Sequence, residues 1–503
     1  MQWSKSVVLT TTLVCLLFSP INSLTAQSQQ IVALPDTPAG KQLKEWLRIF
    51  SGGDQDAFVR YINEHYSKSL LEEDTAVDRA DRQARIYLDS RGFDIRSIEK
   101  FTPEETTVLA QASLTGLWFR LTMKVQAESP YRITEYTAQR IQPPVGTHRK
   151  LNERQLVKEI DRFMKRLAAA DAFSGTLLIA KDGKPIYKTV SGFASKAYRV
   201  PNRLDTKLNI ASMAKMFTAI AIAQLVEQGK LSFTDSIGAL LPDYPNKQVA
   251  EKVTIHHLLT HTSGMGDFHG AKYVCRRSIL REVRDFFPLF VDEPLSFEPG
   301  ARWQYSNAGY MVLGAIIEKV SGENFFDYVR KHVFKPAGMD NTDYYESDRD
   351  TPNLAMGYTN FEELPDDNLR FRLGPRRNTS QYILIRGLPA GGAFSTIEDL
   401  LRFSLALKGN RLLSEKTLNL MISSKVTARK YDAGQTFWGY GFELENIGGK
   451  RVIGHGGGDL GISSAVRWFP DSGNYTVIIL SNYDRGGIIT NYKLQEMIIQ
   501  NQG

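Results

Sequence analysis

The sequence contains an apolar run, Met216 to Val226, that predicts a buried helix. Ser212-Met213-Ala214-Lys215 comes directly before this run. A serine and a lysine three positions apart lie on one helical face, one turn from each other. The start of the buried helix therefore carries a hydroxyl and an amine side by side.

This pairing suits nucleophilic catalysis. A hydroxyl is a weak nucleophile until a nearby base takes its proton. Lysine can be that base only where burial or other cations lower its pKa, and a buried helix provides such surroundings. The same four residues are also compatible with an N-cap at Ser212 followed by an exposed Lys215. The prediction of a nucleophile therefore depends on motifs further along the chain.

The length of 503 residues is too great for one hydrophobic core, so two or three domains are expected. The net charge of +7 favours anionic substrates or an anionic envelope surface, although a solvated basic face would give the same charge. No nucleic-acid-binding motif is present, so binding to nucleic acid is not expected. No cofactor is expected either.

The first residues have the pattern of a secretory signal. Lys5 precedes a short apolar stretch, Val7 to Phe18, and Ala26 offers a small residue for cleavage. We therefore predict a signal peptide over residues 1–26 and a secreted or periplasmic protein without a later transmembrane segment. The alternative is an uncleaved anchor, but the apolar stretch is short for a bilayer. Removal of the signal leaves one cysteine, Cys275, which cannot form an intramolecular disulfide and is interpreted as a surface residue.

Residues 31–141 are expected to form a separate α+β unit. Two helices, the first containing Trp46 and the second covering about Gln55 to Tyr66, precede three alternating strand-like runs at Thr106 to Leu114, Leu117 to Gln126 and Tyr131 to Ile141. This order resembles the cone-shaped folds of the nuclear-transport-factor and polyketide-cyclase type. The resemblance implies either a ligand pocket or a docking module.

Residues 142–152 contain Pro143, Pro144 and Gly146 and are predicted to be a linker. Residues 153–503 begin with an amphipathic helix and a hairpin around Asp182-Gly183, and they end with strands and a helix. A helical region lies between these two ends. This order predicts an α+β fold in which one antiparallel sheet, built from both ends of the region, is flanked by helices and lies beside a helical subdomain.

Two further motifs carry chemically suitable residues. Tyr305-Ser306-Asn307 precedes an apolar helix, where the positive helix end favours a phenolate and Asn307 can recognise an amide. An ordinary N-cap with a packing tyrosine is the alternative. His455-Gly456-Gly457-Gly458 follows a short strand, and its glycines allow a backbone N–H to approach a ligand as an oxyanion donor, with the N–H of Ser212 as the second. A flexible glycine turn is the alternative here.

Together these motifs resemble the serine β-lactamase and penicillin-binding-protein superfamily, in its class C and esterase-like branch. The resemblance covers about residues 153–500 and extends to four more stretches: Leu258 to Gly264, Glu298-Pro299-Gly300, Lys335 to Met339 and Pro389 to Thr396.

The resemblance implies an acyl-enzyme mechanism. It makes Ser212 the nucleophile, Lys215 and Tyr305 the shared base, and Asn307 the group that orients the acyl side. The backbone N–H groups of Ser212 and Gly458 would hold the oxyanion. The substrate would be a small-molecule or peptide ester or amide; the oligomeric state is left open.

One departure from the superfamily changes the expected substrate. Penicillin-recognising members have Lys-Thr-Gly where this chain has His455-Gly456-Gly457. A titrating imidazole replaces a fixed cation, so we expect activity on anionic substrates to fall as His455 loses its proton between pH 5 and 8. An esterase or D-amino-acid peptidase is therefore expected rather than an efficient β-lactamase. A non-catalytic module that binds peptidoglycan or a partner is the alternative.

The sequence contains two other candidate sites: a histidine cluster as a metal site and Ser263 as a nucleophile. His256, His257 and His261 are close in sequence, but no glutamate stands where a zinc metalloprotease helix would place one, so no metal site is expected. Ser263 is a rival nucleophile by position only, since no adjacent base is evident.

Overall fold

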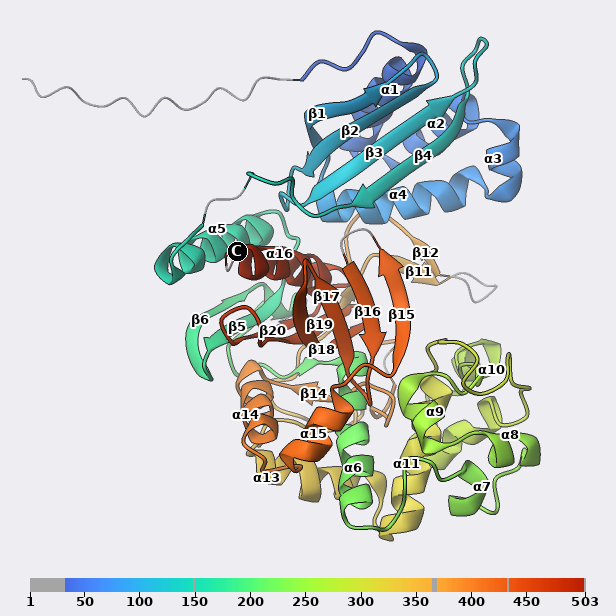
Figure 1. The fold of residues 1–503 in the computed structure, drawn as a ribbon, viewed down its shortest axis with the longest axis vertical. Coiled ribbons are helices and arrows are strands. Elements are labelled where there is room, and N and C mark those ends of the chain that lie inside the picture. Colours follow the sequence, from blue (N-terminus) through green and yellow to red (C-terminus); the bar gives the residue numbers. More distant parts are fainter. Residues whose placement is uncertain (1–31, 148–149, 364–368, 383, 432–433, 502–503) are drawn as a thin grey trace, which may run out of the picture.

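The computed structural model describes residues 32–147, 150–363, 369–382, 384–431 and 434–501. The predicted signal peptide therefore lies outside the described residues. An N-terminal unit of helices and strands lies at one end of the molecule, above a larger unit that contains the big sheet and the helical region (Figure 1). Within the described residues, every helix falls short of the length and apolar character needed to cross a membrane.

The N-terminal unit packs four helices against a four-stranded antiparallel sheet in the order β1-β2-β3-β4. Trp46 is fully buried and stacks on Phe50 and Tyr136, with ring centroids 4.6 and 4.2 Å apart. Aromatic side chains thus fill the space between helices and sheet. The cone-like assignment stays a prediction. The elements of this unit are α1 (Pro38–Gly52), α2 (Gln55–His65), α3 (Lys68–Glu73), α4 (Ala76–Ser90), β1 (Phe93–Phe101), β2 (Glu105–Ala112), β3 (Trp118–Val125) and β4 (Ile133–Arg140).

The expected sheet built from both ends of residues 153–503 is confirmed. Eight antiparallel strands follow the order β15-β16-β17-β18-β19-β20-β5-β6, so a C-terminal strand pairs with an N-terminal one, with Ile478 opposite Leu178. The strands are β5 (Gly175–Lys181), β6 (Lys184–Ser191), β15 (Val426–Tyr431), β16 (Gly434–Trp438), β17 (Glu443–Ile447), β18 (Lys450–Asp459), β19 (Ile462–Phe469) and β20 (Tyr475–Ser481).

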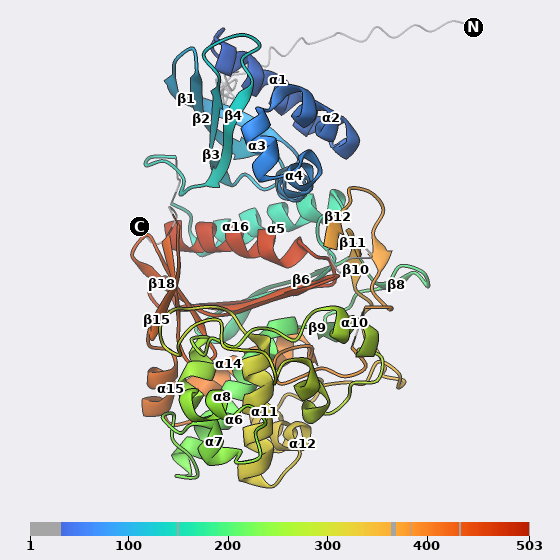
Figure 2. The same cartoon turned by 90° about the vertical axis from the view of Figure 1, so that its right-hand side faces the viewer.

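Helices cover both faces of this sheet, and the α+β class is therefore confirmed (Figure 2). Helices α5 (Glu153–Ala169) and α16 (Gly486–Gln500) lie between the sheet and the N-terminal unit. The helical region lies on the opposite face. Its helices include α6 (Lys215–Glu227), α9 (Ile255–Thr260), α11 (Asn307–Ser321), α12 (Phe325–Val329), α14 (Ile397–Lys408) and α15 (Glu415–Met421).

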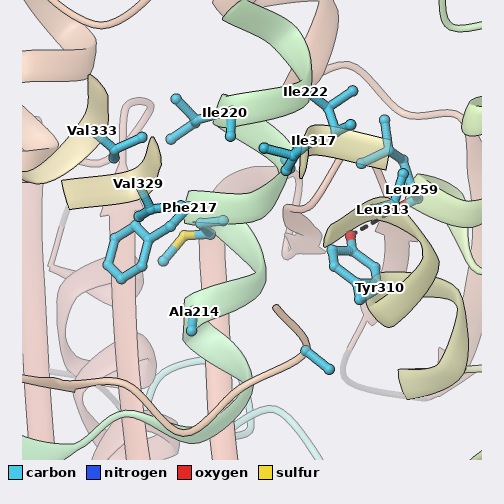
Figure 3. Packing of buried hydrophobic residues seen from close by; sticks show 14 of the residues in the cluster. Ala214, Phe217, Ile220, Ile222, Leu259, Tyr310, Leu313, Ile317, Val329 and Val333 are labelled. Atoms are coloured by element: carbon cyan, nitrogen blue, oxygen red, sulfur yellow. Dashed lines mark hydrogen bonds between the residues drawn. The ribbon is translucent and has the colours of Figure 1, made fainter. Parts of the chain in front are cut away.

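Helix α6 lies at the centre of the helical region, as its apolar sequence predicts. Residues from Lys215 to Ala223 are all buried, and Phe217 contacts the rings of Phe334 and Phe403 edge-on at 5.0 Å. Figure 3 shows helices α6, α11 and α12 converging on this core. Because the helix is buried on every side, its first residue, Lys215, is buried as well.

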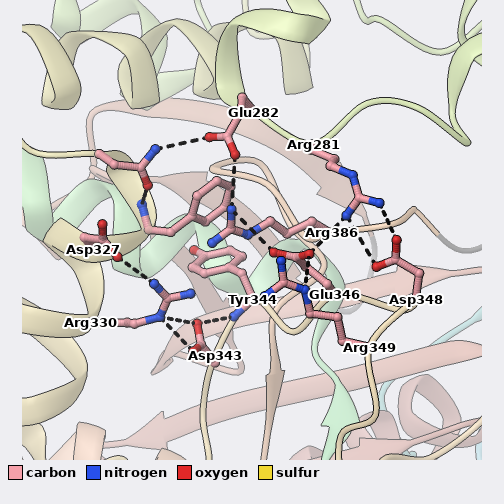
Figure 4. Close-up of polar contacts among 12 residues, drawn as sticks. Arg281, Glu282, Asp327, Arg330, Asp343, Tyr344, Glu346, Asp348, Arg349 and Arg386 are labelled. Carbon is pink, nitrogen blue, oxygen red and sulfur yellow. Dashed lines mark hydrogen bonds and ion pairs between the residues drawn. The ribbon is translucent and has the colours of Figure 1, made fainter.

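A network of ion pairs joins three loops of the helical region (Figure 4). Arg281 Nη1 donates to Glu346 Oε2 at 3.0 Å, and Arg386 Nη1 donates to Glu282 Oε1 at 3.3 Å. Arg330 Nε donates to Asp343 Oδ2 at 2.7 Å. The network thereby fixes the loops on both sides of Tyr345 and Gly387.

Candidate active site

Ser212 and Lys215 lie where the buried helix begins. Ser212 is in the 3₁₀ turn η1 (Ala211–Ala214), and Lys215 is the first residue of α6. Lys215 Nζ donates to Ser212 Oγ at 3.4 Å, to Asn307 Oδ1 at 2.6 Å and to the carbonyl of Ala390. The predicted pair is therefore within contact distance, and the amine is held by three oxygens.

Burial gives this lysine the pKa of a usable base. Desolvation lowers the pKa of Lys215 from its ordinary value to about 7, although the charge of Asp267 opposes part of this shift. At neutral pH a substantial fraction of the amine is therefore unprotonated and can accept the hydroxyl proton. The alternative of an exposed lysine after an N-cap serine is excluded, because the side chain is buried.

Tyr305 lies beside the same amine. Lys215 Nζ is 4.8 Å from the centroid of its ring, and the imidazole of His261 stacks on the same ring, with the two centroids 4.3 Å apart. Burial raises the pKa of Tyr305, and its hydrogen bond with Ser212 lowers it in part. The phenol is therefore protonated at neutral pH, which suits an acid that delivers a proton better than a preformed phenolate.

Asn307 connects the lysine to an acidic residue. Its Oδ1 accepts from Lys215, and its Nδ2 donates to Asp267 Oδ2 at 2.7 Å. Asp267 in turn contacts His269 Nδ1 at 2.8 Å. Burial raises the pKa of Asp267, but the hydrogen bond and charge of His269, together with the hydrogen bonds from Asn307 and the N–H of Phe268, outweigh this effect and leave the pKa below its ordinary value. A carboxylate thus lies one side chain away from the Lys215 amine.

The glycines after His455 belong to strand β18 and not to a loop after it, so the alternative of a flexible turn is wrong. Gly457 pairs with Ser464 of β19, and a Cβ on Gly457 would lie 2.1 Å from the carbonyl oxygen of Ile210. Only a glycine lets this strand approach the turn that carries Ser212 so closely. Ala211, within that turn, has the uncommon φ of 43°.

His455 does not behave as the sequence led us to expect. Burial lowers its pKa to about 4, so the imidazole is neutral throughout the range from pH 5 to 8. Its Nδ1 contacts the carbonyl of Gly456 and must donate there, which leaves Nε2 as an acceptor. The expectation that activity falls as His455 loses its proton between pH 5 and 8 is therefore wrong. Neither a fixed nor a titrating cation is supplied by this position.

Two cavities meet at Ser212. One has a volume of about 170 Å³ and is lined by Asn307 and the aromatic residues Tyr345, Tyr382 and Phe394. The other has a volume of about 1050 Å³ and is lined by Tyr305, His455 and residues that extend to the N-terminal unit. Ser212 and Gly458 line both. The proposed nucleophile and one proposed oxyanion donor thus stand between two compartments of unequal size.

The rival sites do not assemble. His256 Nδ1 contacts Tyr440 at 2.8 Å, while His257 and His261 use their Nδ1 atoms to accept backbone N–H groups. Within the described ranges, no group of three or more histidine, cysteine or acidic residues is arranged to hold a metal ion. Ser263 is buried, and its hydroxyl accepts the N–H of Met265. Cys275 is exposed and unpaired, as expected.

Comparisons with known proteins agree with this geometry. The model of the family described as Beta-lactamase matches residues 158–491. Penicillin-binding protein 4* of Bacillus subtilis (strain 168) is 31% identical over 65% of this chain and 71% of that protein. Esterase EstB of Burkholderia gladioli is 30% identical over 53% of this chain and 73% of that protein. The crystal structure of a penicillin-binding protein from Bacillus halodurans is 32% identical, with a TM-score of 0.57 over 69% of this chain and 99% of that chain.

Proposed function

Because the chain belongs to the Beta-lactamase family, we propose that it is a serine hydrolase that cleaves an ester or amide through an acyl-enzyme on Ser212. One observation carries the proposal: Lys215 is buried, has its pKa lowered to about 7, and donates to Ser212 Oγ at 3.4 Å. A protein that only binds its ligand has no need of this costly arrangement, which disfavours the alternative of a non-catalytic module.

The residues divide the reaction between them. Neutral Lys215 accepts the proton as Ser212 Oγ attacks the acyl carbon, and the N–H groups of Ser212 and Gly458 stabilise the oxyanion. When the bond to the leaving group breaks, Tyr305 gives its proton to the departing oxygen or nitrogen and is reprotonated by Lys215. Water then attacks the acyl-enzyme and gives a proton to Lys215. When the bond between the acyl carbon and Ser212 Oγ breaks, Lys215 passes this proton to Oγ, which releases the acid, restores the Ser212 hydroxyl and leaves Lys215 neutral.

Ester hydrolysis or cleavage of a small amide suits this site better than turnover of β-lactams. The Lys-Thr-Gly cation and hydroxyl are replaced by His455, whose imidazole is neutral, and by Gly456. A β-lactam carboxylate therefore meets no cation at this position. The relative from Burkholderia gladioli is an esterase by name, which supports the same choice. We further propose that the protein is exported, on the basis of the signal-like residues 1–26.

The test is to label Ser212. Wild-type protein is treated with a fluorophosphonate probe, and the modified peptide is identified by mass spectrometry. We expect an adduct on Ser212 and hydrolysis of p-nitrophenyl acetate. Ser212→Ala should lose both, with turnover falling more than about 1,000-fold. Ser263→Ala is the matched control and should keep both. Labelling of Ser263, or equal turnover by Ser212→Ala, would contradict the proposal.

A further inference from the structure

The unequal cavities on the two sides of Ser212 separate the two halves of a substrate. Asn307 lines only the cavity of about 170 Å³, and Tyr305 lines only the cavity of about 1050 Å³. Drug-sized ligands occupy pockets of about 300–1,000 Å³. The first cavity is therefore too small for a large group, whereas the second can enclose one.

The position of the group that protonates the leaving group decides which half of the substrate enters which cavity. The group that protonates a leaving oxygen or nitrogen must lie within hydrogen-bond reach of it. Lys215 is fully buried and its Nζ is held by Ser212, Asn307 and Ala390, so Tyr305 is the acid that a leaving group can reach. The leaving group therefore lies on the Tyr305 side, in the large cavity, and the acyl group lies on the Asn307 side, in the small one.

The small cavity is also rigid. Tyr345, Leu384 and Gly387 line it, and they belong to loops that the network of Arg281, Arg386 and their acidic partners holds together (Figure 4). Enlarging it for a long acyl chain would require this network to open. The acyl group is therefore expected to be short, and an acetyl group fits this volume.

The large cavity has the lining of a site for a polar, uncharged group. Its described lining includes four arginines and four acidic residues, so the charges balance and neither sign of ligand is favoured. The half-buried ring of Trp303 lines the same space, whereas Trp438 is buried and one face of Tyr492 is covered by Arg140. Aromatic faces pack on the C–H groups of a sugar ring, while guanidinium and carboxylate groups bind its hydroxyls as donors and acceptors.

The N-terminal unit forms the far wall of this cavity. Ala138, Gln139 and Arg140 of β4 line it, and the Arg140 guanidinium lies 3.6 Å from the centroid of the Tyr492 ring on α16. The cavity is thus bounded on one side by the nucleophile and on the other by a different unit of the chain. Only a leaving group much larger than methanol or ammonia would contact both.

We propose that the natural substrate is a carbohydrate that carries a short O-acyl group. This inference rests on the proposed function. Ser212 takes the acyl group, the ester C–O bond breaks, the proton from Tyr305 goes to the sugar oxygen, and water later releases the short-chain acid. The sugar lies in the large cavity between the sheet and the N-terminal unit.

Four substrates test the assignment of the halves. The first is p-nitrophenyl acetate, the second is p-nitrophenyl octanoate, the third is an O-acetylated xylotetraose, and the fourth is an N-acetyl tetrapeptide. We expect kcat/KM to be at least about tenfold lower for the octanoate than for the acetate, and we expect the acetylated oligosaccharide to have the highest kcat/KM. An octanoate that is hydrolysed as well as the acetate, or an N-acetyl tetrapeptide that is cleaved better than the oligosaccharide, would overturn the inference.

A variant pair tests the wall that the N-terminal unit provides. Gln139 is exposed and lines the cavity, whereas Thr137 is exposed two residues earlier on the same face of β4 and does not line it. Gln139→Trp fills part of the cavity at its far wall, so it should reduce kcat/KM for the oligosaccharide about tenfold more than kcat/KM for p-nitrophenyl acetate; Thr137→Trp should change neither. Equal effects of Gln139→Trp on both substrates, or no effect on either, would overturn the inference about the sugar. The proposed function itself would be refuted by a different result: wild-type protein that hydrolyses no ester and forms no adduct on Ser212.

Discussion

Lys215 is a charged residue type at a fully buried position, and its protonation state controls the proposed chemistry. Because desolvation lowers its pKa to about 7, the amine is charged below pH 7 and neutral above it. The neutral form accepts the serine proton, so the rate of acylation should rise with pH through about 7 and level off above it. Stopped-flow measurement of acylation by p-nitrophenyl acetate from pH 5 to 9 tests this. A flat profile in this range would mean that another base acts.

Asp267 is predicted to hold that pKa in place. Its carboxylate favours the charged form of Lys215 and is joined to it through Asn307. Asp267→Asn keeps an oxygen for the hydrogen bond but removes the charge, so the pKa of Lys215 should fall and the acid limb of the acylation profile should move to lower pH. A purely structural role would lower the rate at every pH without moving the limb. Glu298→Gln, a charge change at a surface ion pair with Lys252, is the control.

Single residues of the site differ in how far the sequence predicts them. Ser212, Lys215 and Tyr305 could be predicted because each lies in a short local motif, and these motifs together resemble the superfamily. Asp267 could not be found in the same way, since its contact with Asn307 spans 40 residues. The neutral state of His455 depends on complete burial by segments distant in the sequence, so the unperturbed pKa gave the wrong charge.

At the scale of elements, the close approach of strand β18 to the η1 turn is the feature that builds the site. A Cβ at Gly457 would lie 2.1 Å from the Ile210 carbonyl oxygen, and backbone atoms cannot move aside cheaply. Gly457→Ala should therefore push the strand away from Ser212, with a loss of about 1–3 kcal/mol of stability and more than about tenfold in kcat/KM. Thermal unfolding and ester hydrolysis measure the two effects.

The neighbouring glycine provides the control for that variant. A Cβ at Gly458 would meet nothing nearer than the Ile462 carbonyl oxygen at 3.8 Å, which is an ordinary contact. Gly458→Ala also keeps the backbone N–H that is proposed to hold the oxyanion. It should therefore retain stability and most of its activity. Equal losses in both variants would show that the close approach is not what the site requires.

The helices and strands that the sequence predicted are those with a clear turn motif or a clear pattern of apolar residues. The hairpin of β5 and β6 has an Asp-Gly turn, and α6 has an unbroken apolar run. Strand β1 was missed because most of its residues are exposed or half-buried, and α4 because its sequence is largely polar and charged. Strand β16 was missed as well, since its first four residues are half-buried and show no alternation. Such elements are specified mainly by the neighbours on which they pack.

At the scale of the whole molecule, specific polar contacts hold the N-terminal unit on the larger one. Arg485 Nε, at the start of α16, donates to Asp89 Oδ1 of α4 at 2.9 Å. Gln55 donates to the carbonyl of Phe371 at 2.9 Å, and Asp81 accepts the N–H of the same residue. A short hairpin of the larger unit, formed by β11 (Phe361–Glu363) and β12 (Leu369–Phe371), thus contacts helices of the N-terminal unit. Both units are therefore expected to unfold together.

This coupling can be broken without touching either core. In the double variant Asp81→Ala/Asp89→Ala, Arg485 loses its carboxylate partner while it remains largely buried. The free energy of unfolding should therefore fall by more than it would on loss of a surface ion pair. We expect calorimetry to show one unfolding transition for the wild type and two for the double variant, because the units then unfold separately. Asp56→Ala removes an exposed acid from α2 and should keep one transition. If the wild type already unfolds in two steps, the units are independent, and the far wall of the large cavity would not be held in place.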